Sequence, residues 1–253
     1  MVTKENIAII PARGGSKRIP KKNILAFCGK PMIAWTIEAA LKSGIFDKVF
    51  VSTDDNEISE IAKSFGADVP FLRDKYTDNV SNSGDALLYS LEQIETKLKE
   101  KYKTVFHLLP NCPIRNDKDI NDAYNYFIKS KGIFQISCFK FGWMNPWWAA
   151  RLDKKLKPDF LYPQGLKSRS QDLDDLYCPT GAVWIANVEK LKETKTFYSQ
   201  PLAFFPMDWK SAVDIDNYED LEMAKAIYLM KQESQKLCIK KDCVIMATKN
   251  KIK

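Results

Sequence analysis

Short apolar runs alternate along the chain with segments whose apolar residues recur at a helical period. Three such runs, each followed by turn residues, predict strands buried on both faces: residues 7–10, 49–53 and 105–109. The helical period predicts four helices between and after them: residues 33–43, 57–65, 86–102 and 120–130. Strands that alternate with helices are typical of a mostly parallel sheet covered on both sides. We therefore expect a three-layer α/β fold.

The second half of the chain continues this pattern. Further strands are expected at residues 133–139, 181–186 and 202–205. A last helix should run from Tyr218 to about Glu233, because Asp216 and Asn217 offer caps and acidic residues occupy its first turn. We expect one domain over residues 1–235 and a basic tail over residues 236–253, where no period predicts a fold.

Residues 142–177 interrupt the alternation of strands and helices. This stretch holds three of the six tryptophans, together with prolines and scattered charges. Aromatic residues without a strand or helix period favour an excursion that packs on a second copy of the chain, which predicts a homodimer. The alternative is a long loop folded over its own domain.

Composition narrows the class of protein. Apolar residues make up 45% of the chain and charged residues 28%, which is typical of a globular protein. No apolar stretch approaches the ~18 residues that span a bilayer, and the first residues do not read as a secretory signal. We therefore expect a cytoplasmic protein without a membrane partner. The six cysteines form no CxxC pair and His107 is the only histidine, so neither a zinc site nor a redox dithiol is supported.

A formal net charge of +7 indicates an anionic partner or a solvated basic end. Part of the excess lies in residues 231–253, where a basic tail is usually just solvated. Composition alone leaves nucleic acid and an anionic small molecule both open.

The loop after the first strand, residues 11–23, is the first candidate site. Ligands of open parallel sheets bind at the carboxyl ends of strands. Gly14 and Gly15 would let backbone N–H groups turn inward as an anion-binding nest. Five cations suited to a triphosphate surround them: Arg13, Lys17, Arg18, Lys21 and Lys22. Neither GxGxxG nor Gly-Lys-Ser/Thr occurs, which disfavours a dinucleotide-binding fold of the usual kind and a P-loop.

Residues 9–23 resemble the N-terminal signature of the acylneuraminate cytidylyltransferases. In that family an apolar strand is followed by Ala-Arg, two small residues, Ser-Lys, and then Pro, Lys and Asn. The resemblance continues at residues 29–32, 51–54, 72–73, 110–115 and 214–216, and it covers roughly residues 6–230. It implies a Rossmann-like nucleotidyltransferase fold that transfers CMP from CTP to a sialic-acid-type sugar acid and releases pyrophosphate. It also implies small-molecule substrates rather than nucleic acid.

The paired carboxylates of Asp214 and Asp216 fit a metal site. Residues two apart on an extended segment point the same way, and Mg²⁺ prefers oxygen ligands that it shares with substrate phosphates. A cap on the following helix is the alternative role for Asp216. With the resemblance added, Mg²⁺ is the expected cofactor, held by both aspartates.

The resemblance also assigns the other site residues. Arg13, Lys22 and Asp216 are the expected catalytic groups. The expected nucleotide-binding residues are Arg13, Gly14, Gly15, Ser16, Lys17, Lys22, Asn23, Arg73, Ser81 and Ser83. His107 lies in an apolar strand, which favours a core position over a general base.

Two segments depart from the family pattern. Leu109 stands where well-known bacterial members carry Gln, and Asn111 and Cys112 replace Thr and Ser. Cys178 begins a segment where members often carry an Arg. These departures leave the identity of the sugar undecided, and a pseudaminic, legionaminic or 3-deoxy-octulosonic acid is an alternative acceptor. A catalytically silent relative that only binds nucleotide is a further alternative.

Overall fold

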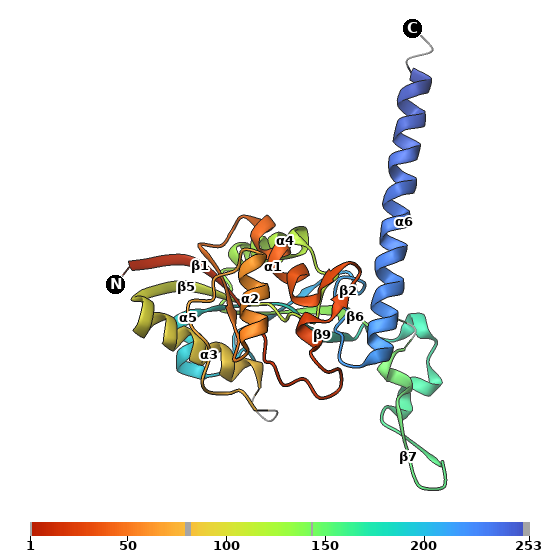
Figure 1. The fold of residues 1–253 in the computed structure, drawn as a ribbon. Helices are drawn as coiled ribbons and strands as arrows, with labels where there is room; N and C mark the ends of the chain where they lie inside the picture. The colour runs from red at the N-terminus through yellow and green to blue at the C-terminus, as the bar shows by residue number, and fades with distance from the viewer. Residues whose placement is uncertain (1, 79–81, 143, 250–253) are drawn as a thin grey trace.

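The main sheet lies at the centre of three layers (Figure 1). A computed structural model describes residues 2–78, 82–142 and 144–249, with side chains up to Ser234. Within these residues the sheet has six strands in the order β10-β6-β9-β5-β1-β4. Their bounds are Val2–Pro11 (β1), Lys48–Ser52 (β4), Glu100–His107 (β5), Phe134–Lys140 (β6), Tyr177–Asn187 (β9) and Leu202–Pro206 (β10). β9 is antiparallel to β5 and β6, and the other pairings are parallel. The predicted α/β fold with a mostly parallel sheet is confirmed.

Alternate residues of β1 pack into two separate cores, one on each face of the sheet. Ala8 and Ile10 pack with α1 (Met32–Ser43), α2 (Asn56–Ser64) and α4 (Asp117–Lys129) on one face. Ile7 and Ile9 pack with α3 (Ser83–Gln93) and α5 (Val188–Thr194) on the other face. All four β1 residues are fully buried. A strand covered by helices on both sides must be apolar throughout, which is why this run was readable from the sequence.

Short elements complete the path to the last helix. They are a 3₁₀ turn at Lys22–Ile24, strands β2 (Ala26–Phe27) and β3 (Lys30–Pro31), and the helix α6 (Tyr218–Lys249). Leu221, Ala224 and Ile227 of α6 pack against Phe27 and Met32. The helix continues past the predicted end at Glu233 and projects away from the domain (Figure 1). Where a helix has no neighbouring layer, it needs no apolar stripe, and the sequence then carries no period to detect.

The predicted helix over residues 86–102 is too long. α3 ends at Gln93, a π-helical turn follows at Ile94–Leu98, and β5 begins at Glu100. The first half of β5 pairs with the mostly polar start of β1, and ion pairs join the two strands: Lys4 with Glu100 at 2.8 Å and Lys103 with Glu5 at 2.6 Å. Pairing between residues about a hundred positions apart decides this boundary, and local periodicity does not report it.

The segment at residues 142–177 extends away from the sheet (Figure 1). It contains a two-stranded hairpin of β7 (Ala150–Leu152) and β8 (Pro158–Phe160) and short 3₁₀ turns at Pro146–Trp148, Pro163–Lys167 and Ser170–Asp172. Trp147 donates from its indole to the Asp174 carbonyl oxygen at 3.0 Å. Leu152 and Leu156 are 62% and 76% exposed. Most of the apolar side chains here are therefore not covered by their own domain.

No helix among the described residues has both the length and the apolar character needed to cross a membrane.

His107 ends β5 inside the core. It is 1% exposed and packs against Trp184 and Phe197, with ring centroids 5.2 and 5.8 Å away. Neither ring nitrogen has a hydrogen-bond partner among the described residues. Burial lowers the pKa of His107 to about 3, so the ring is neutral at pH 7. It is a core residue, as the apolar strand predicted.

We expect His107 to make the free energy of unfolding fall as the pH is lowered. Below about pH 6.5 the unfolded chain binds a proton at this ring that the folded chain does not bind until about pH 3. Between pH 7 and pH 4.5 the free energy of unfolding should therefore fall by roughly 2–3 kcal/mol more in the wild type than in His107→Phe. Urea unfolding of both proteins at several pH values measures this difference. Parallel pH profiles would mean that the folded protein carries a charged His107.

Candidate active site

The carboxyl ends of β1 and β5 border a cleft of about 220 Å³. Its walls come from the loop after β1, the segment after β4, the start of α3, the loop after β5 and the segment before α6. The lining residues are Pro11, Arg13, Ser16, Arg18, Lys22, Asn23, Arg73, Tyr76, Asn82, Ser83, Ala86, Leu109, Pro110, Asn111 and Asp216. This is the position that ligands occupy in open parallel sheets.

The structure divides the five cations of the first loop into two groups. Arg13, Arg18 and Lys22 line the cleft, whereas Lys17 is exposed and does not. Lys21 points elsewhere and pairs with Glu57 at 2.6 Å. The loop is held in place by the Asn23 side chain, which donates to the Arg13 carbonyl oxygen at 2.9 Å. Three cations therefore converge on one cleft.

Gly14 and Gly15 do not form the predicted anion-binding nest. Neither has a positive φ, which such a nest requires at one of its residues. The Gly14 N–H donates to an Asp54 carboxylate oxygen at 3.0 Å. A Cβ on Gly14 would lie 2.6 Å from Asp55 Oδ2, whereas Gly15 faces open space. A glycine at position 14 therefore lets the loop after β1 lie close to the segment after β4. A nucleotide contact by either glycine stays a prediction.

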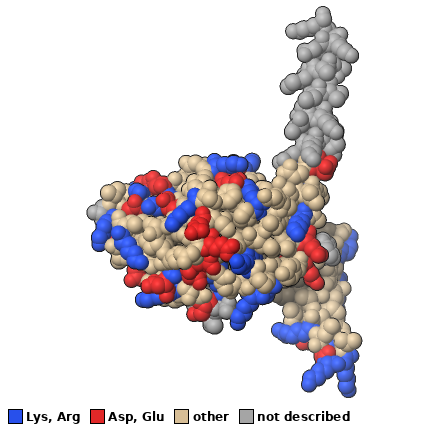
Figure 2. Space-filling view, in the orientation of Figure 1, with Lys and Arg blue, Asp and Glu red and all other residues tan. Residues whose placement is uncertain are grey.

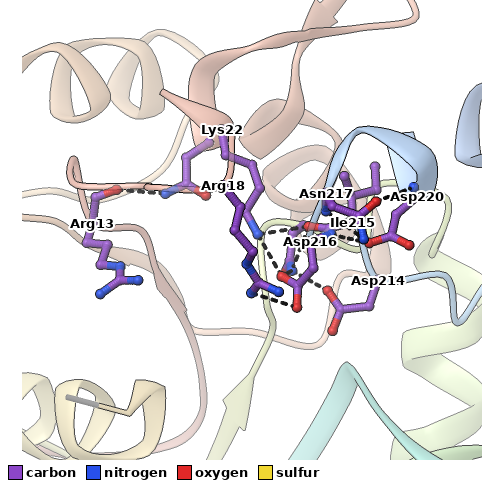
Figure 3. Close-up of polar contacts among 10 residues, drawn as sticks. Arg13, Arg18, Lys22, Asp214, Ile215, Asp216, Asn217 and Asp220 are labelled. Atoms are coloured by element: carbon purple, nitrogen blue, oxygen red, sulfur yellow. Dashed lines mark hydrogen bonds and ion pairs between the residues drawn. The ribbon is translucent and has the colours of Figure 1, made fainter. Parts of the chain in front are cut away.

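Asp216 binds both nearby cations of the loop (Figure 3). Lys22 Nζ lies 2.9 Å from Asp216 Oδ1 and 2.8 Å from the Ile215 carbonyl oxygen. Arg18 Nη2 lies 2.9 Å from Asp216 Oδ2. Burial raises the pKa of Asp216, but the hydrogen bond and charge of Lys22 and the charge of Arg18 outweigh burial and lower it overall. Asp216 is thus an ionised carboxylate in an ion-pair network.

The cap of α6 is Asn217 and not Asp216. The Asn217 side chain accepts from the Asp220 N–H at 2.9 Å, and Asp220 accepts from the Asn217 N–H at 3.0 Å. This reciprocal pair satisfies the first turn of the helix. The Asp216 side chain therefore does not cap the helix; it lines the cleft, where Lys22 and Arg18 pair with it.

Asp214 lies beside Asp216 and is much more buried. The Asn111 side-chain amide donates to Asp214 and, at 3.2 Å, to the Ile215 carbonyl oxygen. Burial and the charge of Asp216 raise the pKa of Asp214 to about 6. The carboxylates of Asp214 and Asp216 point toward the same side of the segment before α6 (Figure 3).

This donor set fits a magnesium ion. No group of three or more His, Cys, Asp or Glu side chains that could enclose a metal occurs in the described part of the chain. Mg²⁺ is usually held by one or two carboxylates, with substrate phosphates and waters completing its shell. Asp214 and Asp216 supply that number.

Arg73 borders the cleft but is bound to the protein itself. It is 4% exposed, and its guanidinium donates to the Ser52 carbonyl and hydroxyl oxygens, each at 2.8 Å. Burial lowers the pKa of Arg73. Ser83, the first residue of α3, lines the cleft, and Ser81 lies outside the described residues. The predicted nucleoside contacts of these three residues stay predictions.

Sequence reasoning did not single out two supports of the cleft. Arg115 is 2% exposed and donates to the Ala182 carbonyl oxygen at 2.5 Å and to Thr36 Oγ1 at 2.6 Å. Asn111 was noted only as a departure from the family pattern, yet its amide is the partner of Asp214. Their position in the loop after β5 was the available signal, because that loop follows a strand at the carboxyl edge.

Comparison with known proteins decides the family. Residues 7–106 match the family model of the cytidylyltransferases. The pseudaminic acid cytidylyltransferase of Campylobacter jejuni is 37% identical over 233 residues, which cover 91% of this chain and 99% of the relative. The chain belongs to the cytidylyltransferases of nonulosonic sugar acids. It is therefore a nucleotidyltransferase, as the sequence predicted.

Other cytidylyltransferases match at similar levels. The CMP-N,N′-diacetyllegionaminic acid synthase of Legionella pneumophila is 31% identical, over 90% of this chain and 98% of the relative. The N-acylneuraminate cytidylyltransferase of Escherichia coli is 32% identical, over 91% of this chain and 54% of the relative. A solved CMP:2-keto-3-deoxy-manno-octonic acid synthetase, complexed with CTP, superposes with a TM-score of 0.66 at 18% identity, covering 91% of this chain and all of that one. This structural likeness supports the fold.

We expect Lys22→Ala to lower kcat by roughly 10²–10³, because Lys22 is a preorganised cation in the cleft. The matched control is Lys21→Ala, which removes a neighbouring lysine that pairs with Glu57 outside the cleft. Initial rates of pyrophosphate release measure both, with thermal unfolding to confirm that each variant is folded. Similar small effects at both positions would show that Lys22 does not act on the nucleotide.

Proposed function

We propose that this cytidylyltransferase transfers CMP from CTP to the anomeric hydroxyl of a nonulosonic acid of the pseudaminic or legionaminic type, releasing pyrophosphate. The observation that carries the proposal is one cleft in which Arg13, Arg18 and Lys22 converge beside the Asp214–Asp216 pair. The sialic acid expected from the sequence becomes the second candidate, favoured by the N-acylneuraminate relative.

The chemistry asks the protein mainly for positioning and charge neutralisation. The anomeric hydroxyl oxygen attacks the α-phosphorus of CTP and gives up its proton to solvent. A new P–O bond forms as the bond from the α-phosphorus to the α–β bridging oxygen breaks, and pyrophosphate leaves in line. Arg13, Arg18 and Lys22 hold the triphosphate and offset charge on the leaving group. Mg²⁺ on Asp214 and Asp216 would supply further charge neutralisation at the phosphates. The presence of all these groups argues against a catalytically silent relative.

Leu109 supports an acceptor other than N-acetylneuraminic acid. Its side chain lines the cleft and packs so closely on Gly181 that a Cβ there would overlap it. The Gln that the family pattern places here could hydrogen-bond a sugar hydroxyl, and Leu cannot. An acceptor hydroxyl left unpaired against this wall would weaken binding. An acceptor with an apolar group at this point fits better.

The proposal is tested by pyrophosphate release from CTP with a panel of acids. We expect turnover with pseudaminic or legionaminic acid above that with N-acetylneuraminic or 3-deoxy-octulosonic acid, preference for CTP over UTP, and loss of activity in EDTA. Leu109→Gln should shift kcat/KM toward N-acetylneuraminic acid by about tenfold, because it restores a hydrogen-bonding group. Leu109→Met is the matched control and should leave the preference unchanged. No turnover with any acid would refute the enzymatic proposal.

We propose that the protein is a homodimer through residues 142–177, here called the excursion. Its Trp148, Leu152, Leu156 and Phe160 are exposed, and a group of large exposed apolar side chains in one segment supports an interaction surface. We expect light scattering to give twice the chain mass of 29.0 kDa. Leu152→Asp with Phe160→Asp should give the monomer mass. A wild type that stays monomeric at high concentration would contradict the proposal.

We further propose that the partners are small molecules, with the cytoplasm as the site of action. Lys and Arg are interspersed with Asp and Glu on the face shown in Figure 2. A nucleic-acid surface would gather cations into a patch or stripe. The mixed charges of this face form no such patch, which supports small-molecule partners. The cytoplasmic location stays a prediction from the sequence.

A further inference from the structure

Each carboxylate oxygen of Asp216 lies beside a cation. Lys22 Nζ is 2.9 Å from Asp216 Oδ1, and Arg18 Nη2 is 2.9 Å from Asp216 Oδ2 (Figure 3). Mg²⁺ binds carboxylate oxygens at about 2.0–2.1 Å, so a divalent ion on Asp216 would share an oxygen with one of these side chains. Two positive groups that close together repel each other. A divalent ion and the two side chains therefore compete for Asp216.

The two cations are held very differently. Lys22 has 14% of its side chain exposed and also donates to the Ile215 carbonyl oxygen at 2.8 Å. Arg18 has 66% of its side chain exposed, and its pair with Asp216 is its only ion pair or side-chain hydrogen bond within the described residues. An exposed ion pair adds little to stability, whereas breaking a buried one is costly. Arg18 is therefore the cation that can leave Asp216.

Arg18 has a second place to bind within the same cleft. It lines the cleft together with Arg13 and Lys22, where the proposed function places the triphosphate. A planar guanidinium can bind two phosphate oxygens at once. Position 18 falls between the Ser-Lys and the Pro of the family signature, so that signature does not fix an arginine there. A role for Arg18 therefore has to be argued from its contacts in this chain.

We propose that Arg18 exchanges between two partners, Asp216 Oδ2 and the phosphates of the nucleotide, and that this exchange couples metal binding to triphosphate binding. The inference rests on the proposed function, because it takes a divalent ion and a triphosphate as the occupants. Phosphate that draws Arg18 away leaves Asp216 Oδ2 to the ion. By reciprocity, an ion on Asp216 favours the pairing of Arg18 with phosphate. Lys22 keeps its contacts in both arrangements.

The test measures the two ligands separately. Mn²⁺ alone is titrated into the protein and followed by the electron paramagnetic resonance of free Mn²⁺, and tripolyphosphate alone is titrated in EDTA by calorimetry. Arg18→Ala should lower the Kd for Mn²⁺ roughly two- to fivefold, the range that an exposed ion pair represents. It should raise the Kd for tripolyphosphate about tenfold, because a charge-assisted contact is lost. A variant that merely disturbed the fold would weaken both.

Arg13→Ala is the matched control. It removes the same kind of side chain from the same cleft, but Arg13 Nη1 donates to the Asp78 carbonyl oxygen at 2.5 Å, and Arg13 has no contact with Asp216 among the described residues. Arg13→Ala should therefore weaken tripolyphosphate as Arg18→Ala does and leave the Kd for Mn²⁺ within about twofold of the wild type, since a more distant charge is screened.

Two results would overturn the inference. One is an Mn²⁺ affinity in Arg18→Ala that equals or falls below that of the wild type. The other is equal tightening of Mn²⁺ in Arg18→Ala and Arg13→Ala, which would reflect the overall charge of the cleft and not a shared oxygen. Asp216→Asn separates these from a failure of the proposed function. If it binds Mn²⁺ as well as the wild type does, the ion does not bind at Asp216, and the proposed metal role itself is refuted.

Discussion

The contact on which the site depends is the one that Lys22 makes with Asp216 and the Ile215 carbonyl oxygen. It joins the loop after the first strand to the segment before the last helix, across 194 positions of sequence. The lysine is mostly buried, with 14% of its side chain exposed, so losing either partner would leave a buried charge with less compensation. The same contact places cations and carboxylates in one cleft. The contact therefore both holds these two segments of the domain together and assembles the site.

The two aspartates of this cleft differ because their surroundings differ. Asp216 faces Lys22 and Arg18, which keep it ionised. Asp214 is more buried, beside the charge of Asp216, and its pKa is raised. Arg13, Arg18 and Lys22 outnumber the two aspartates, which leaves a net positive charge in the cleft that suits an anionic ligand. Asn111 fixes the position of Asp214 before any substrate arrives, and Arg115 ties the loop after β5 to Ala182 and Thr36.

Much of the fold was accessible from local pattern. The buried strands and the helices that flank them were predicted within a few residues, because a strand covered on both faces has to be apolar throughout. The errors share one cause. The start of β5 and the length of α6 depend on a distant strand or on the absence of a neighbour, and neither leaves a period in the local sequence. The antiparallel direction of β9 is likewise a property of the assembled sheet.

By itself the sequence determined the chemistry that this protein carries: a cation-rich loop after the first strand and two carboxylates before the last helix. It also determined the family, through motifs spread over most of the chain. Only the tertiary structure decided which of these residues work together. It turned Lys21 away and Lys22 inward, bound the Gly14 amide to Asp54, and tied the Arg73 guanidinium to the backbone. It also brought Tyr76, which carries no motif, to the edge of the cleft. The physical reason is that charge and hydrogen-bonding capacity belong to single residues, whereas direction, burial and partners arise when distant segments pack.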